Sequence, residues 1–359
     1  MIVTVSYLYA DTRRLRQVFI LDSIEQVERR ECPADKKIKH RMLIFLSKMG
    51  DNMIEMRGLS RSFGNTRVVD NLNLTINEGE VFGFLGPNGA GKTTTVRMLA
   101  CLIRPTDGTA LINGLNIRNE KEAMRIRREI GLLTESPGLY DTLSAQRNLE
   151  FYARLYDVPE VKRNERIEHY LKMMGLWEKR KEPVGGFSKG MKQKMAIARC
   201  LIHEPKVLFL DEPTSGLDPE ASRIVRDFIL ELKGEGRTIF LCTHNLDEAD
   251  RICDRIAIMK GAILGVDTPS RLKNDLYGRS ISIQLMEVTP ELVEKVQALG
   301  FIKNLSVSGN TLTMSVGAPE QANPALVRVL VSMGADVQFV YENKHSLEEV
   351  YFKVTGAAK

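Results

Sequence analysis

The sequence GPNGAGKTT at residues 86–94 limits the folds open to this chain more than any other segment. It follows a short apolar run at residues 81–85 and precedes a helical pattern at residues 93–102. A GxxxxGKT loop between a strand and a helix typically binds phosphate, because its backbone N–H groups and the helix N-terminus point at the phosphates. We therefore expect a nucleoside triphosphate to bind here.

Each residue type in this loop has an expected role. The glycines allow a tight turn that brings successive N–H groups toward the β-phosphate. Lys92 can reach the β- and γ-phosphates, the Thr93 hydroxyl can ligate Mg²⁺, and Thr94 is placed for a neighbouring phosphate. The residues expected around the nucleotide are Gly86, Pro87, Asn88, Gly89, Ala90, Gly91, Lys92, Thr93 and Thr94.

Two adjacent carboxylates, Asp211 and Glu212, follow a second apolar run at residues 207–210. In a phosphate-loop protein the first carboxylate holds Mg²⁺, usually through water, and the second orients the water that attacks the γ-phosphorus. Asp211 is thus a predicted metal ligand and Glu212 the predicted general base.

Apolar runs alternate with helical patterns between residues 53 and 274. The run at residues 238–242 adds a third buried strand, so the alternation predicts an α/β fold with a largely parallel, helix-flanked core sheet. Residues 144–180 carry helical spacing without a strand signal and are predicted to form a helical insertion.

Three further segments complete a recognisable set: FSKGM at residues 187–191, SGLD at residues 215–218, and His244 directly after the third strand. In this order and spacing, residues 53–274 resemble the nucleotide-binding subunit of an ABC transporter. The resemblance implies a P-loop cassette, ATP hydrolysis coupled to transmembrane transport, and two subunits that sandwich two ATP molecules.

The resemblance also implies individual roles. Phe63, just before Gly64, matches the aromatic residue that stacks on adenine. Ser188 and Gly190 match the signature positions that contact the γ-phosphate of ATP held by the opposite subunit. Asp218 ends the loop that crosses the dimer interface. His244 matches the switch histidine that contacts the γ-phosphate and acts in catalysis with Glu212 and Lys92.

Three positions depart from the family pattern. Glu135 stands where the family has a glutamine that contacts nucleotide and helps to ligate Mg²⁺; a glutamate can still be a ligand but adds negative charge near the γ-phosphate. Lys189 replaces a signature glycine and Met191 a glutamine. Ser188 and Gly190 are retained, so nucleotide contact is expected to survive.

The implied partners are a polytopic membrane permease and a second ATPase subunit. This chain carries both Glu212 and Ser188, so two copies can form two complete sites. The expected location is cytoplasmic, peripheral on the inner face of the cell membrane. A final domain like those of drug, sodium or polysaccharide export ATPases indicates export.

The alternative is a soluble cassette ATPase that acts on ribosomes or DNA. Such translation factors generally carry two cassettes on one chain, whereas this chain carries one. Chromosome-type members have long coiled coils between the phosphate loop and the signature, and there is no room for one here. No strong basic stripe is present, and no nucleic-acid partner is expected.

The two ends of the chain differ from the cassette. Residues 1–52 carry basic clusters without a clear amphipathic period, and two interpretations stay open: a start-site artefact or poorly ordered segment, or a basic extension that touches nucleic acid or lipid. Residues 280–359 show a βαββαβ order that predicts a small ferredoxin-like domain, followed by a capped final helix. We expect this region to support dimerisation or regulation.

Composition excludes several other classes. The hydrophobic fraction of 43% beside 27% charged residues is typical of globular proteins. No stretch approaches the ~20 apolar residues that span a bilayer, and the basic residues follow the apolar start, unlike a secretory signal. The five cysteines form no CxxC pair, so neither a disulfide framework nor a zinc site is predicted.

Overall fold

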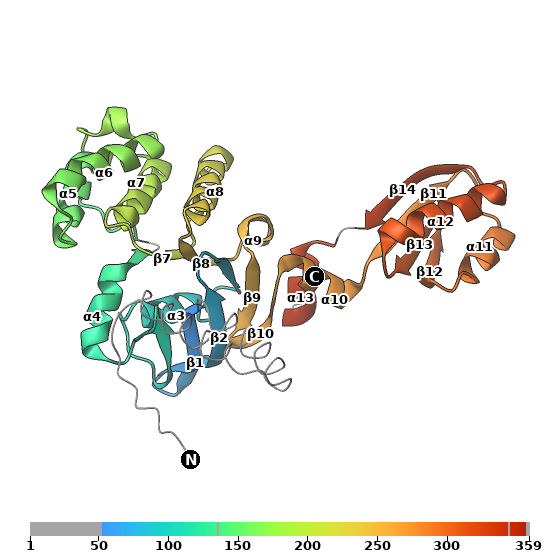
Figure 1. Cartoon of the computed structure of the whole chain (residues 1–359), viewed down its shortest axis with the longest axis horizontal. Helices are drawn as coiled ribbons and strands as arrows, with labels where there is room; N and C mark the ends of the chain where they lie inside the picture. Colours follow the sequence, from blue (N-terminus) through green and yellow to red (C-terminus); the bar gives the residue numbers. More distant parts are fainter. Residues whose placement is uncertain (1–51, 135, 344, 357–359) are drawn as a thin grey trace, which may run out of the picture. The chain divides into compact units, whose positions relative to one another are not determined.

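The computed structural model of the chain describes residues 52–134, 136–343 and 345–356. Glu135 and the basic segment before Asn52 lie outside these residues, so the predictions made for them stay untested. The described elements form a cassette with two sheets and flanking helices, followed in sequence by a smaller α+β unit (Figure 1).

A six-stranded sheet forms the centre of the cassette, in the order β10-β9-β3-β8-β7-β6. It is parallel from β9 to β6, with β10 antiparallel at one edge. Every residue of β3, β7 and β8 is buried, as expected for parallel strands covered on both faces. The predicted parallel core sheet is confirmed. The strands are β3 (Val81–Leu85), β6 (Ile130–Leu133), β7 (Val207–Asp211), β8 (Thr238–Thr243), β9 (Arg255–Lys260) and β10 (Ala262–Asp267).

A four-stranded antiparallel sheet covers one face of the core sheet, in the order β2-β1-β4-β5. The two sheets share one hydrophobic cluster that includes Phe82, Phe84 and Phe240. The rings of Phe84 and Phe240 lie 5.1 Å apart between centroids. The strands are β1 (Asn52–Phe63), β2 (Thr66–Asn77), β4 (Asp107–Ile112) and β5 (Leu115–Asn116).

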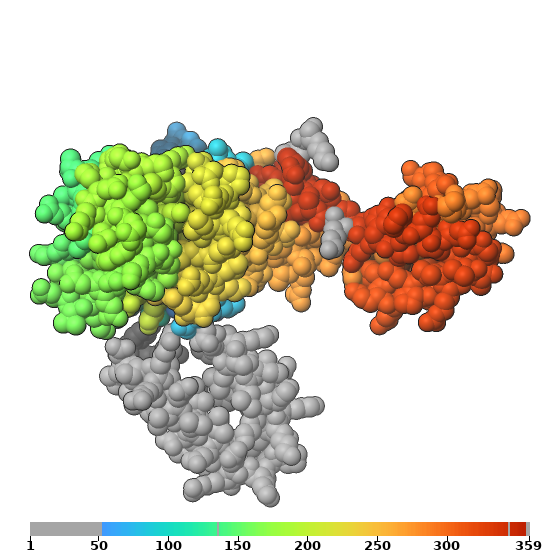
Figure 2. Space-filling model, turned by 90° about the horizontal axis from the view of Figure 1, so that it is seen from above, coloured from blue at the N-terminus to red at the C-terminus, as the bar shows by residue number. Residues whose placement is uncertain are grey.

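Helices cover the other face of the core sheet. Val81 and Leu85 point to this side, opposite to Phe82 and Phe84, as the alternation along a strand requires. The surfaces of α5–α7 and of α8 adjoin in Figure 2, in agreement with the hydrophobic cluster that these helices share. The helices on this side are α5 (Ala145–Leu155), α6 (Glu160–Met173), α7 (Lys189–Leu201), α8 (Pro219–Gly234) and α9 (Leu246–Ile252). The predicted helical insertion thus contains α5 and α6.

The remaining cassette helices are α3 (Lys92–Leu99), α4 (Glu120–Glu129) and α10 (Pro269–Tyr277). Helix α3 is shorter than the expected residues 93–102. It ends at Leu99 because Cys101 adopts a left-handed conformation with φ of 57°, which cannot continue a right-handed helix.

The second sheet-and-helix unit has the order β11-α11-β12-β13-α12-β14 and an antiparallel sheet ordered β12-β13-β11-β14. This is the expected ferredoxin-like arrangement, with a hydrophobic core of its own. Helix α12 begins at Pro319, a proline in the first turn where proline is favoured, and it contains a second proline, Pro324. The elements are β11 (Ser280–Leu285), α11 (Pro290–Gln297), β12 (Ile302–Ser308), β13 (Thr311–Val316), α12 (Pro319–Ser332) and β14 (Val337–Asn343).

The final helix, α13 (Leu347–Thr355), packs with the cassette rather than in the core of the small sheet. Leu347 and Val350 are buried in the cassette's helical cluster. The Tyr277 hydroxyl donates to the Glu349 carbonyl oxygen at 3.0 Å, and the rings of Tyr277 and His345 stack with centroids 4.3 Å apart. None of the described helices combines the length and apolar character needed to cross a membrane.

Candidate nucleotide-binding site

The phosphate loop connects β3 to α3 in a conformation that requires glycine. Gly89 and Gly91 have φ values of 80° and 101°, in the region that favours glycine. A Cβ on Gly86 would lie 2.6 Å from the Met259 carbonyl oxygen, closer than a Cβ can approach. The core sheet therefore packs directly beneath this loop.

Lys92 begins α3, and its ammonium turns back into the loop. Its Nζ donates to the carbonyl oxygens of Gly86 at 2.7 Å and Pro87 at 3.3 Å. The same Nζ lies 3.8 Å from Oε1 of Glu212, and both side chains are largely buried. A positive charge is thus held between the loop and the paired carboxylates.

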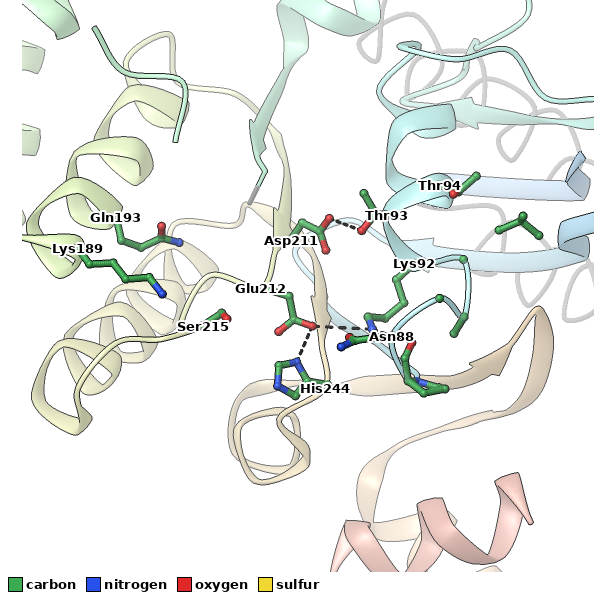
Figure 3. A pocket seen from close by; sticks show the side chains of 15 residues that line it. Asn88, Lys92, Thr93, Thr94, Lys189, Gln193, Asp211, Glu212, Ser215 and His244 are labelled. Carbon is green, nitrogen blue, oxygen red and sulfur yellow. Dashed lines mark hydrogen bonds and ion pairs between the residues drawn. The ribbon is translucent and has the colours of Figure 1, made fainter. Parts of the chain in front are cut away.

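Thr93 and Asp211 meet across the site. Thr93 Oγ1 donates a 2.7 Å hydrogen bond to Oδ2 of Asp211, which is buried at the carboxyl end of β7 (Figure 3). Behind Asp211, burial raises the pKa of the Cys242 thiol well above its usual range, with the charge of Asp211 acting in the same direction. Cys242 is therefore a neutral neighbour of the carboxylates.

Glu212 sits at a strained turn between β7 and the following loop. Its φ of 51° is uncommon for a residue with a side chain, and such strain is concentrated at functional sites. Its backbone N–H donates to the Cys242 carbonyl oxygen at 2.9 Å, which fixes the turn to β8. Its Oε1 lies 2.8 Å from Nδ1 of His244, so these two side chains meet at the mouth of the site (Figure 3).

These side chains line one cavity of about 490 Å³. The phosphate-loop residues from Pro87 to Thr94, the paired carboxylates and His244 all border it, as expected. The remaining lining residues are Val68, Lys189, Gln193 and Ser215.

Gly86 does not line the cavity, although its carbonyl oxygen accepts from Lys92. Four other predicted site residues lie elsewhere in the described chain. Phe63 is 47% exposed, and the guanidinium carbon of Arg61 lies 4.5 Å from its ring centroid. The Ser188 hydroxyl caps α7, and the Asp218 carboxylate caps α8. Gly190 lies in the first turn of α7. None of the four lines the cavity.

Lys189 and Gln193 were not predicted as cavity residues. Both project from α7 toward the carboxylates (Figure 3). Nζ of Lys189 lies 1.9 Å from the position of a Cβ on Gly216, and the φ of 67° at Gly216 is in the region that favours glycine. Gln193 Nε2 donates to the Pro213 carbonyl oxygen at 2.8 Å. The departure from the signature at Lys189 was the one available sequence signal.

A cavity lined by a phosphate loop and a carboxylate pair on a parallel sheet defines the chain as a P-loop nucleoside triphosphatase. Residues 69–215 match the family model described as ABC transporter. The chain is 34% identical over 312 residues to the ABC transporter ATP-binding protein YhcH of Bacillus subtilis, covering 86% of this chain and 97% of YhcH. It is 35% identical over 316 residues to the bacitracin transport ATP-binding protein BcrA of Bacillus licheniformis, covering 85% and 97%.

Solved structures agree with these sequence relatives. The ATP-binding subunit of an ABC transporter is similar with a TM-score of 0.59 and 30% identity, covering 63% of this chain and 94% of that chain. A dimeric cassette in a post-hydrolysis state bound to ADP and Pi has a TM-score of 0.56 and 27% identity, covering 60% and 98%. The chain belongs to the ATP-binding subunits of ABC transporters. The predicted ATPase is confirmed, and the alternative of a ribosome- or DNA-directed ATPase is not supported.

Proposed function

We propose that ATP binds with Mg²⁺ in the 490 Å³ cavity and that Glu212 and His244 act on its γ-phosphate. The observation that carries this proposal is the convergence of two groups on one carboxylate: Oε1 of Glu212 lies 2.8 Å from His244 Nδ1 and 3.8 Å from Lys92 Nζ. A base, a cation and an imidazole so close together suit phosphoryl transfer to water.

The oxygen atoms present fit Mg²⁺. The Thr93 hydroxyl and the Asp211 carboxylate are hard oxygen ligands at the border of the cavity. Thr93 Oγ1 and Asp211 Oδ2 lie 2.7 Å apart, so one cation can contact both residues. Bound there with ATP, Mg²⁺ would neutralise charge on the β- and γ-phosphates. Glu135 keeps its proposed role as a further ligand.

In the proposed hydrolysis reaction, each of these side chains has a distinct role. Glu212 accepts a hydrogen bond from a water molecule and orients its oxygen toward the γ-phosphorus. The P–O bond to ADP breaks as the new bond to water oxygen forms, and the water proton passes to Glu212 or to the phosphate. Lys92 holds the β- and γ-phosphates. His244, which like Lys92 lies next to Glu212, contacts the γ-phosphate.

The active unit is proposed to contain two cassettes. Dimeric structures among similar proteins support this, and Phe63, Ser188, Gly190 and Asp218 keep their proposed roles toward adenine, the opposite nucleotide and the dimer interface. Two copies of this chain suffice, because each supplies a Glu212 turn and a Ser188 turn. The exposed cap of α7 at Ser188 agrees with a contact made across subunits.

The transport partner is proposed to be a separate permease, with this chain bound at the cytoplasmic face of the membrane. Two aromatic side chains, one just before the helical insertion and one within it, suit such docking: Tyr140 and Phe151 are exposed, and their ring centroids lie 4.9 Å apart. Relatives named for bacitracin transport and daunorubicin resistance, together with a Nod factor export protein, support export as the direction.

The region at residues 280–359 is proposed to support dimerisation or regulation. Its edge strand β14 exposes Phe339 and Tyr341, which are available to a partner. Excision of residues 280–343, with a short glycine-serine linker that retains α13, tests this role. We expect weaker dimerisation or altered ATPase regulation; unchanged dimerisation, ATPase rate and transport would contradict it.

Purification from native membranes in mild detergent tests the transport function. We expect a stoichiometric polytopic membrane protein to be identified by mass spectrometry with the chain. A docking variant that introduces a charge, Phe151→Glu, should lose that partner but keep ATP binding. The matched variant Leu264→Glu, at an exposed position of β10, should keep both. Recovery of ribosomal or DNA-bound proteins without a membrane partner would overturn the proposal.

A further inference from the structure

A buried carboxylate that the proposed function does not use lies directly behind the catalytic turns. Glu248 is in the first turn of α9 and only 2% exposed. Its side chain faces inward toward the loops after β7 and β8. An ionisable group placed so deeply is costly unless hydrogen bonds compensate for its lost hydration, so its contacts require an explanation.

Both catalytic loops bond to one oxygen of this carboxylate. Oε2 of Glu248 accepts a 2.9 Å hydrogen bond from Thr214 Oγ1, which lies two positions after Glu212. The same oxygen accepts a 3.4 Å hydrogen bond from Thr243 Oγ1, which immediately precedes His244. Glu248 therefore connects the loop that carries the base to the loop that carries the histidine.

The backbone around Glu248 holds it in this position. Asn245 caps α9: its Oδ1 accepts from the Glu248 N–H at 3.1 Å. The Asn245 N–H in turn donates to Thr243 Oγ1 at 3.0 Å. The other carboxylate oxygen, Oε1, is buried and has no hydrogen-bond partner within the described part of the chain. Burial raises the pKa of the Glu248 carboxyl, opposed first by the Thr214 hydrogen bond.

We propose that Glu248 is a positioning residue for hydrolysis, which sets the distance between Glu212 and His244 by holding Thr214 and Thr243 together. The contact it maintains is the 2.8 Å approach of Glu212 Oε1 to His244 Nδ1. Glu248 itself does not line the cavity. The inference rests on the proposed roles of Glu212 and His244, because a fixed distance matters only if both act on the γ-phosphate.

The test compares Glu248→Ala with Glu248→Gln in the full-length chain, by steady-state ATPase rates and equilibrium ATP binding. Loss of alignment at a reacting centre costs up to about 100-fold, so we expect Glu248→Ala to lower kcat about 10- to 100-fold. ATP affinity should change little, since the phosphate loop does not touch Glu248. The glutamine oxygen still accepts from Thr214, so Glu248→Gln should keep kcat within about threefold of wild type.

A second variant covers the case in which Glu248→Ala fails to fold. Thr214→Val removes one hydroxyl while keeping the side-chain shape, and it should lower kcat alone. In the double variant Glu248→Ala/Thr214→Val, the loss of kcat should not exceed that of Glu248→Ala alone. Either change already removes the hydrogen bond between Thr214 and Glu248, so the second change has nothing further to remove. Thr238→Val is the matched control: this buried threonine of β8 bonds the Gly79 N–H, away from the cavity, and should leave kcat unchanged.

Four outcomes would overturn the inference: wild-type kcat in folded Glu248→Ala, wild-type kcat in Thr214→Val, a loss in Glu248→Gln equal to that in Glu248→Ala, or additive losses in the double variant. Glu212→Gln, measured in the same assay, separates this inference from the proposed function. If Glu212→Gln is inactive while Glu248→Ala is normal, only the positioning role fails. If Glu212→Gln is normal, the proposed general base itself is wrong.

Discussion

Thr93 Oγ1 and Asp211 Oδ2 form a 2.7 Å hydrogen bond although 118 positions separate the two residues. The bond is possible because β3, which leads into the phosphate loop, and β7, which ends at Asp211, both pair with β8 in one parallel sheet. Their carboxyl ends therefore reach the same edge, where ligands of open parallel sheets bind. The predicted pair of metal ligands is one consequence of this sheet order.

Replacement of the proposed base should separate ATP binding from hydrolysis. Glu212→Gln removes a proton acceptor but keeps the side-chain shape, so turnover should fall by at least about 100-fold while ATP still binds. Single-turnover ATPase assays and ATP-dependent dimer formation on a sizing column measure the two effects. Wild-type turnover in this variant would show that Glu212 is not the base.

Loss of the buried ammonium should instead weaken ATP binding. Lys92→Ala removes the cation held by the Gly86 and Pro87 carbonyls, so the affinity for ATP should fall at least about tenfold. Equilibrium binding of a fluorescent ATP analogue measures the change. An unaltered affinity would contradict the role assigned to the phosphate loop.

The signature lysine should contribute a smaller electrostatic effect. Lys189 borders the cavity and is in no ion pair within residues 52–134, 136–343 and 345–356, so Lys189→Ala should raise the KM for ATP about two- to fivefold, and less at high salt. Lys192→Ala is the matched control, because Lys192 lies on the same helix but pairs with Asp141 at 3.0 Å. Equal changes in the KM for ATP in the two variants would contradict a contribution of Lys189 to ATP binding.

Acid should destabilise the fold through one histidine. Burial lowers the pKa of His203 from 6.5 to about 4; its Nε2 lies 2.9 Å from the Ile130 carbonyl oxygen, and its ring stacks on Tyr156. The unfolded chain therefore binds the extra proton first, and the free energy of unfolding should fall by up to about 3 kcal/mol as the pH drops from 6.5 to 4.

Denaturant titrations at several pH values measure this contribution. His203→Gln keeps an N–H donor for the Ile130 carbonyl but does not titrate, so its free energy of unfolding should depend less on pH over this range. Identical pH profiles for the variant and the wild type would assign the acid sensitivity to other groups.

The final helix should stabilise the cassette. Leu347 is 2% exposed in the cassette's helical cluster, so Leu347→Ala should lower the free energy of unfolding by about 2–4 kcal/mol. Leu155, at 64% exposure, supplies the control, for which the change should stay within about 0.5 kcal/mol. Thermal unfolding measures both, and equal stabilities would contradict the packing of α13.

Local sequence signals predicted most of the fold and the centre of the site. The phosphate loop follows one buried strand, Asp211 ends another and Glu212 comes directly after it, and buried strands with flanking glycines can be recognised from sequence. The same holds for the βαββαβ unit, whose turns and capping residues punctuate the chain.

Residues that line the cavity or lie behind it through tertiary packing were missed. Gln193 and Glu248 lie on helices whose inward faces depend on how α7 and α9 pack beside β7 and β8. Neither residue belongs to a sequence motif. From sequence alone, a glutamate on a helix is expected at the helix surface, so the burial of Glu248 could not be predicted. The return of α13 to the cassette was likewise not expected, because its amphipathic pattern fits a partner in either unit.

The stacking of Tyr277 on His345 means that the chain leaves the cassette and re-enters it at nearly the same point. The small sheet is thus an insertion within the cassette, because α13, which follows it in sequence, packs with the cassette again. A stop codon after Tyr277 would remove part of the ATPase core together with the small sheet. An excision between these two rings would keep the ATPase core intact. A partner bound to the small sheet would act on the cassette through two chain connections, one at Tyr277 and one at His345.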